Sequence, residues 1–122
     1  EIDRVVRCQT QDTMFANKLI ALIERYENKN KVAGRDLYDV HQFFLQGFRY
    51  KKEIIQARRK SSLVIFFEEL VDFLQRVVTD RMIEQDLNTL LPYKEFRLIR
   101  KILKQESILL LQDELKRLKS DA

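Results

Sequence analysis

Apolar residues recur every three or four positions along most of the chain, which is the spacing of an α-helix that buries one face. This periodicity predicts helices over residues 12–26, 35–46, 50–59, 62–78, a shorter one over 80–91, and a last helical region over 93–119. Apolar residues near the N-terminus, Ile2, Val5 and Val6, could instead form a short strand remnant. We therefore expect an all-α bundle of five or six helices.

Breaks between these helices are marked by polar and glycine residues. Residues 27–31 are all polar, which predicts a frayed helix end and a loop, and Gly47 is placed to close the second helix in the left-handed conformation. In the last region, two apolar stripes are out of phase, so we expect a bend or break near residues 105–107. The first stripe consists of Phe96, Ile99 and Leu103, and the second of Ile108, Leu111, Leu115 and Leu118.

Composition narrows the class of protein. The chain has 122 residues, enough for one compact domain, and only 2 Gly and 1 Pro, which argues against sandwiches, barrels and doubly wound sheets. A single cysteine, Cys8, cannot form an internal disulfide and fits a reducing compartment. No apolar run approaches the roughly 18 to 20 residues that would span a bilayer. We expect a cytoplasmic protein without membrane contact.

Charge is distributed in blocks that the net value of +4 conceals. Residues 49–60 carry six basic side chains against one acidic, and residues 93–104 carry five against one. Within the second block, one helical stripe gathers four cations that are candidate RNA-binding residues, because Lys and Arg near phosphates release condensed counterions. These four are Lys94, Arg97, Lys101 and Lys104. A solvated helix face explains the same pattern without a ligand.

The first two helices bring a lysine and two carboxylates within reach of each other. Asp36 and Asp39 are three residues apart and share a helix face, with Arg35 just before them. Lys18 lies at the margin of the apolar stripe of the preceding helix, where an ammonium is costly unless it meets a carboxylate or a phosphate. If the two helices pack antiparallel, Lys18 faces Asp36 or Asp39. Such a cluster suits a triphosphate site, and a salt bridge that only locks the helices is equally compatible with it.

Other candidate residues lack partners in the sequence. His41 has only Cys8 as a further metal-ligating or nucleophilic companion, so we expect no metal site within this chain and treat His41 as an ordinary helix residue. Tyr38 lies on the opposite helix face from Asp36 and is expected in the core.

Residues 18–22 (KLIAL), Arg25 and residues 34–39 (GRDLYD) together resemble the C-terminal signature of the AbiEii/AbiGii abortive-infection nucleotidyltransferase toxins. Residues 85–88 (QDLN), 90–92 (LLP) and Phe96 are similar to the helical C-terminal part of the same group. The resemblance covers roughly residues 5–115 and implies the toxin of a type IV toxin–antitoxin or phage-defence pair, with a DNA-polymerase-β-like nucleotidyltransferase fold.

The resemblance also implies roles for individual residues. Lys18 would contact the nucleotide phosphates with Arg35 in support, and Asp36, or else Asp39, would complete the catalytic site. An NTP, Mg²⁺, an acceptor such as tRNA, and an antitoxin protein are implied for the complete enzyme. The glycine-rich turn and the Asp-x-Asp pair that this chemistry needs are missing from the chain. We therefore expect residues 1–122 to be a single helical domain that lacks the N-terminal catalytic half and is inactive alone. The alternative is a non-enzymatic helical module that binds RNA or protein.

Overall fold

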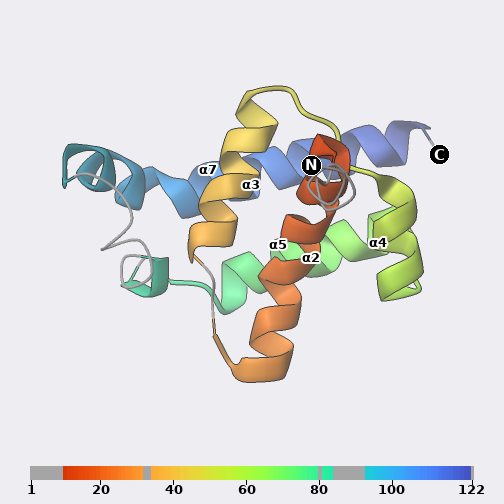
Figure 1. Cartoon of the computed structure of the whole chain (residues 1–122), viewed down its shortest axis with the longest axis horizontal. Helices are drawn as coiled ribbons and strands as arrows, with labels where there is room; N and C mark the ends of the chain where they lie inside the picture. The colour runs from red at the N-terminus through yellow and green to blue at the C-terminus, as the bar shows by residue number, and fades with distance from the viewer. Residues whose placement is uncertain (1–9, 32–33, 80, 84–92, 122) are drawn as a thin grey trace, which may run out of the picture.

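The computed structural model describes residues 10–31, 34–79, 81–83 and 93–121, except for the side chains of 93–98, 100, 101 and 121. Its five long helices are α2 (Gln11–Lys29), α3 (Gly34–Leu45), α4 (Lys52–Arg59), α5 (Leu63–Arg76) and α7 (Tyr93–Asp121) (Figure 1). The described residues contain no strand, and the predicted all-α class is confirmed. The possible strand at Ile2, Val5 and Val6 and most of the helix expected over 80–91 lie outside the described residues.

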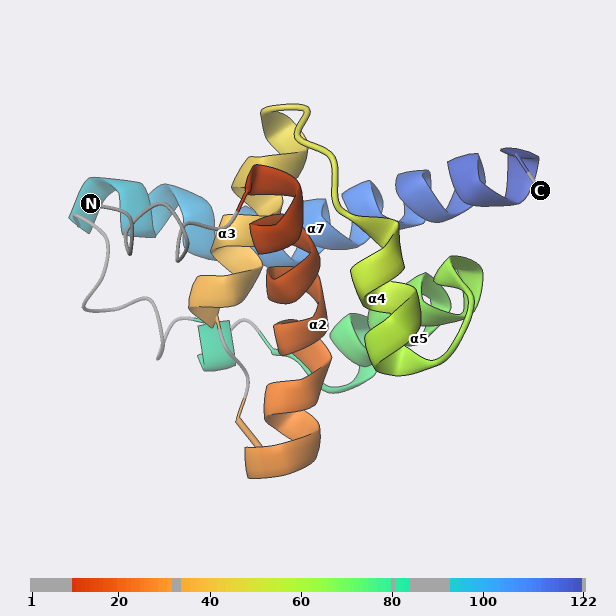
Figure 2. The same ribbon diagram turned by 45° about the vertical axis from the view of Figure 1, so that its right-hand side comes forward.

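The helices form two crossing pairs. α2 and α3 lie side by side, and α5 and α7 lie beside each other across them, with α4 at one side against α2 and α5 (Figures 1 and 2). α3 also contacts α7, so the long last helix lies against both pairs. In Figure 1, α2 and α3 lie on the viewer's side of α5 and α7.

The core lies where the two pairs cross and is dominated by aromatic rings. Phe15 of α2 is fully buried, and its ring centroid is 5.2 Å from that of Phe43 and 4.9 Å from that of Phe44. Phe66 and Phe67 of α5 are also fully buried. Each such ring removes a large apolar area from water, which is the main favourable contribution to folding. The helical spacing of the phenylalanines thus reflects core packing, as does the half-buried position of Tyr38.

Helix ends are set by local chemistry. Ser62 precedes α5, and its hydroxyl accepts a hydrogen bond from the Ile65 N–H at 3.2 Å, a normal N-terminal cap. At the end of α3, Gly47 has φ of 76°, its N–H donates to the Phe44 carbonyl, and the Phe48 N–H donates to the Phe43 carbonyl. These two bonds make a Schellman motif, which needs a residue in the left-handed region. The predicted left-handed cap at Gly47 is confirmed.

The helix expected to end near residue 26 continues by one more turn. α2 extends to Lys29 and ends at Asn30, whose φ of 53° lies in the left-handed region. Of the polar residues 27–31, Glu27, Asn28 and Lys29 therefore belong to the helix, while Asn30 and Lys31 follow it. Glu27 is also paired with Arg59 of α4, a contact that the local sequence does not reveal.

The predicted break near residues 105–107 is wrong, because α7 is continuous from Tyr93 to Asp121. The two apolar stripes are joined by Ser107, which is 1% exposed and stands between buried Leu103 and Leu111. The buried face drifts around the helix because α7 contacts α3 in its middle and α5 further along. His41 of α3 meets Glu106, whereas Lys119 reaches Glu68 of α5.

Candidate functional site

The short connection between α2 and α3 brings Lys18 opposite the first turns of α3. The Lys18 Nζ atom lies 2.9 Å from Asp36 Oδ1 and 3.1 Å from Asp39 Oδ2. Three residues separate the two aspartates, so their carboxylates project from one helix face toward the same ammonium. The structure thus brings together three of the residues that the sequence singled out. We call Lys18, Arg25, Asp36 and Asp39 the Lys18 cluster.

Asp36 is the buried centre of this cluster. Its side chain is 3% exposed, its Oδ1 atom accepts from Lys18, and its Oδ2 atom lies 3.0 Å from Arg25 Nε. Lys18 and Arg25 are seven residues apart, two helical turns, so both reach the same carboxylate from one face of α2. A buried carboxylate is costly unless paired, and here two cations compensate it.

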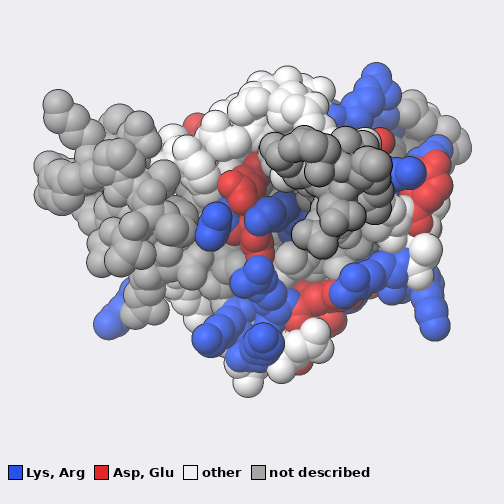
Figure 3. Space-filling model, in the orientation of Figure 1, with Lys and Arg blue, Asp and Glu red and all other residues white. Residues whose placement is uncertain are grey.

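The outer part of the cluster is open to solvent. The side chains of Lys18 and Asp39 are 29% and 32% exposed, and that of Arg25 is 58% exposed. Figure 3 shows acidic side chains flanked by basic ones on this face, in the region where α2 and α3 lie side by side in Figure 1. A ligand can therefore approach Lys18 and Asp39 without unfolding either helix.

Lys18 is charged in this setting. Burial disfavours the ammonium, but the hydrogen bonds to Asp36 and Asp39 outweigh that cost, and the pKa of Lys18 is raised above its ordinary value. An ammonium has three N–H donors, of which the two aspartates take two. One N–H donor of the Lys18 ammonium is therefore not taken by the two aspartates.

Arg35, the remaining predicted residue of this site, is exposed in the first turn of α3. It is four residues before Asp39 and therefore shares the face of α3 that meets Lys18. Its expected role in support of phosphate binding stays a prediction.

A second ion-pair cluster involves the basic segment 49–60. Arg58 lies 2.9 Å from Glu24, while Arg59 lies 2.9 Å from Glu27, 3.4 Å from Glu24 and 3.5 Å from Glu69. We call these five residues the Arg59 cluster. Arg59 is only 14% exposed, and it joins α4 to α2 and α5. Two cations of the basic segment 49–60 are therefore already used to hold helices together.

Candidate RNA-binding residues of the last helix are mostly beyond what the structure describes. The side chains of Lys94, Arg97 and Lys101 lie outside the described residues, and Lys104 is half-buried. Their assignment remains a prediction.

His41 has a partner that sequence reasoning missed. Its ring is 2% exposed, and its Nε2 atom lies 2.8 Å from Glu106 Oε1 on α7, 65 residues away in the chain. No local signal could reveal a pairing over that separation. His41 therefore fastens α3 to α7 and is more than an ordinary helix residue.

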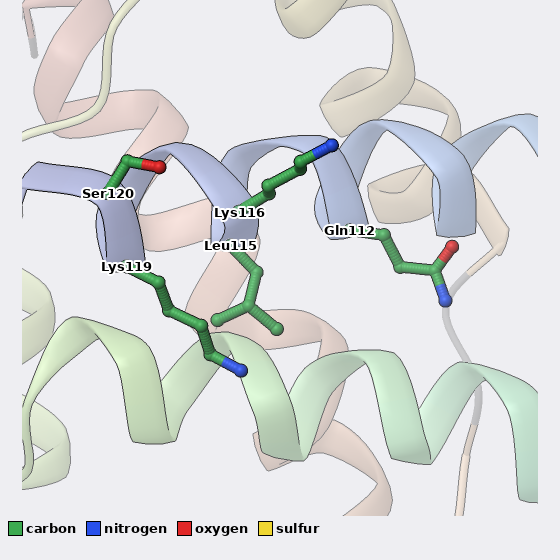
Figure 4. A pocket seen from close by; sticks show the side chains of 5 residues that line it. All are labelled: Gln112, Leu115, Lys116, Lys119 and Ser120. Atoms are coloured by element: carbon green, nitrogen blue, oxygen red, sulfur yellow. The ribbon is translucent and has the colours of Figure 1, made fainter.

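A shallow pocket lies apart from both clusters, on the C-terminal part of α7 (Figure 4). Its lining is Gln112, Leu115, Lys116, Lys119 and Ser120, none of them a predicted functional residue. Within the described ranges, no group of three or more His, Cys, Asp or Glu side chains could hold a metal ion. No helix in the described part of the chain is long and apolar enough to cross a membrane.

Fold and site together define a helical domain that presents a carboxylate-held lysine on an open face. A family model described as nucleotidyl transferase AbiEii toxin of type IV toxin–antitoxin systems matches residues 1–113, and the chain belongs to this family. The resemblance at residues 18–22, Arg25 and 34–39 is thereby confirmed. Comparisons with curated proteins and with solved structures give no match. Membership indicates NTP and metal use in the complete enzyme and an antitoxin partner.

Proposed function

We propose that this helical domain supplies the nucleotide-phosphate contact of a toxin nucleotidyltransferase, with Lys18 as the contacting residue. The position of Lys18 Nζ, 2.9 Å and 3.1 Å from two aspartates and still partly open to solvent, is the observation that supports this role. Two carboxylates fix the direction of Lys18 and leave one donor for a phosphate oxygen.

The two aspartates have different parts in this proposal. Asp36 accepts a hydrogen bond from Lys18 at Oδ1, while its Oδ2 lies 3.0 Å from Arg25 Nε without forming a hydrogen bond, and the side chain is almost fully buried. Asp36 therefore holds Lys18 in position. Asp39 has one oxygen beside Lys18 and is partly exposed, so it is the carboxylate that can accept a proton or a hydrogen bond from a ligand. Arg35, on the same face, supports the phosphates.

Mg²⁺ does not fit between these carboxylates as they stand. A Mg²⁺ ion is held by carboxylate oxygens and waters, whereas here the ammonium of Lys18 and the guanidinium of Arg25 already neutralise Asp36. We place the metal, together with the rest of the NTP, on an N-terminal nucleotidyltransferase domain that faces the Lys18 cluster. The acceptor in this proposal is tRNA.

The test is transfer from a labelled NTP pool onto total tRNA by the full-length protein. Lys18→Ala should lower the transfer rate by about 100-fold or more, the loss typical of removing one donor to a developing charge. Asp39→Asn should also lower it, because the open carboxylate is lost.

Lys119→Ala is the matched control, because Lys119 also pairs with a carboxylate of another helix, at 3.3 Å from Glu68, but lies away from the Lys18 cluster. It should leave transfer unchanged. Thermal unfolding of all variants separates loss of the site from loss of the fold. Full transfer by a folded Lys18→Ala variant would overturn the proposal.

A further inference from the structure

The surface of α2 that leads away from Lys18 is positively charged in a way that the sequence hides. Residues 24–31 mix two glutamates with three cations. In the fold, Glu24 and Glu27 turn toward α4, where Arg58 and Arg59 neutralise them. The cations Arg25, Lys29 and Lys31 are left exposed.

Helix geometry places these cations in line with Lys18. At about 100° per residue, Arg25 and Lys29 lie within about 20° of the direction of Lys18, whereas Glu24 and Glu27 lie about 120° and 180° away. Lys31 follows directly after the left-handed Asn30 that ends the helix. Figure 3 shows basic side chains gathered over the lower half of α2.

The charges of Lys29 and Lys31 are available to a ligand, whereas Arg25 also pairs with Asp36. No ion pair joins Lys29 or Lys31 to another residue in the described part of the chain. Arg25 uses Nε toward Asp36, and its side chain is 58% exposed. Arg35 is exposed at the start of α3, just beyond the connection that Lys31 begins.

The distance between Lys18 and Lys29 along α2 indicates the kind of anion. From Lys18 to Lys29 the helix rises by about 16 Å, at 1.5 Å per residue. That distance matches roughly five phosphates of a stacked strand, at about 3.4 Å per phosphate. A single triphosphate is shorter and would be met by Lys18 and its nearest neighbours alone.

We propose that Arg25, Lys29 and Lys31 form a phosphate-tracking row that carries the acceptor RNA strand along α2 to the Lys18 cluster. That the bound polyanion is RNA rests on the proposed function. That the strand runs along α2 rests on the positions of Arg25, Lys29 and Lys31. This surface differs from the stripe Lys94, Arg97, Lys101 and Lys104 expected from the sequence.

The test measures equilibrium binding of a labelled single-stranded RNA by the full-length protein, without NTP, across a salt series. Lys29→Ala combined with Lys31→Ala should weaken binding roughly 10- to 30-fold near 0.1 M salt and reduce the slope of log affinity against log salt by about 1.4. The affinity for labelled ATP should stay within about twofold, because Lys18 is intact.

The matched control is Lys51→Ala combined with Lys52→Ala, which removes the same charge from two exposed lysines at the start of α4. It should change RNA affinity by less than about threefold. The proposal would be overturned if both double variants weakened RNA binding equally, or if only the control weakened it. It would also be overturned if the Lys29 and Lys31 variant lost ATP affinity but kept its RNA affinity.

Failure here is distinguishable from failure of the proposed function. If Lys18→Ala abolishes transfer while the Lys29 and Lys31 variant binds RNA normally, only the row is wrong. If the row is needed for RNA binding but Lys18→Ala transfers normally, the site assignment is wrong.

Discussion

The two ion-pair clusters on α2 use the same kinds of side chain and differ in which charge is buried. In the Lys18 cluster a carboxylate, Asp36, is 3% exposed and the cations lie toward solvent. In the Arg59 cluster a cation, Arg59, is 14% exposed, and the carboxylates around it are more open. The Lys18 cluster has its N–H donors toward solvent, whereas the Arg59 cluster has the N–H donors of Arg59 surrounded by glutamates.

This difference determines what each cluster can do. The Lys18 ammonium is partly open to solvent and has a donor that the two aspartates do not take, while the guanidinium of Arg59 directs both terminal nitrogens toward glutamates. Hydrogen bonds from Arg59 lower the pKa of Glu27, and the glutamate contacts raise the pKa of Arg59. We interpret the Arg59 cluster as a fastening between helices and the Lys18 cluster as a site.

The largest expected effect on folding comes from removing the buried carboxylate. Asp36→Ala should lower the free energy of unfolding by about 3 kcal/mol, because two cations lose the partner that both share in a buried position. Urea denaturation measures this change. Asp39→Ala, at a position 32% exposed, should cost less than about 1 kcal/mol. Equal losses for the two aspartates would contradict the distinction between a holding and an open carboxylate.

A smaller effect is expected from the Arg59 cluster. Arg59→Ala should lower the free energy of unfolding by about 1 kcal/mol, since it removes contacts to α2 and α5, and it should leave nucleotide transfer intact. Arg58→Ala, at a position 60% exposed, should change stability by less than about 0.5 kcal/mol. Loss of nucleotide transfer in a folded Arg59→Ala variant would contradict the interpretation of the Arg59 cluster as a fastening between helices.

The smallest effects concern pH, and the two clusters should respond at opposite ends. The pKa of Lys18 is raised in the fold. The stability that the Lys18 ion pairs contribute is therefore complete below the ordinary lysine pKa of 10.5 and is lost as pH rises through the folded pKa. The hydrogen bond from Arg59 lowers the pKa of Glu27. The stability that this pair contributes is therefore complete above the ordinary glutamate pKa of 4.5 and is lost as pH falls through the folded pKa.

Melting temperatures at both pH extremes test this pair of responses. Lys18→Met should flatten the alkaline branch relative to the wild type, and Glu27→Gln should flatten the acid branch. An unchanged alkaline branch in Lys18→Met, or an unchanged acid branch in Glu27→Gln, would contradict the corresponding pKa shift.

Much of this architecture is predictable because it depends on local spacing. The positions of α3, α4 and α5 follow from apolar periodicity and from caps such as Ser62 and Gly47. The meeting of Lys18 with Asp36 and Asp39 is also predictable, since a short connection leaves two amphipathic helices little choice but to pack antiparallel.

Other features could not be predicted because they depend on distant contacts. Ser107 looked like a break in the apolar pattern, yet it is buried where α7 passes from one neighbour to another. His41 had no visible partner, and Glu106 reaches it from 65 residues away.

Local spacing in the chain is enough to predict the helical class, most of the helices and the meeting of Lys18 with Asp36 and Asp39, since side chains three, four and seven residues apart share a helix face whatever surrounds them. Which charges stay exposed to solvent depends instead on how the helices pack. Arg25, Lys29 and Lys31 stand beside two glutamates in the chain, and it is α4, with Arg58 and Arg59, that neutralises those glutamates and leaves the cations to solvent. Charge balance on a surface depends on which helices meet there, and that is settled by the burial of the core.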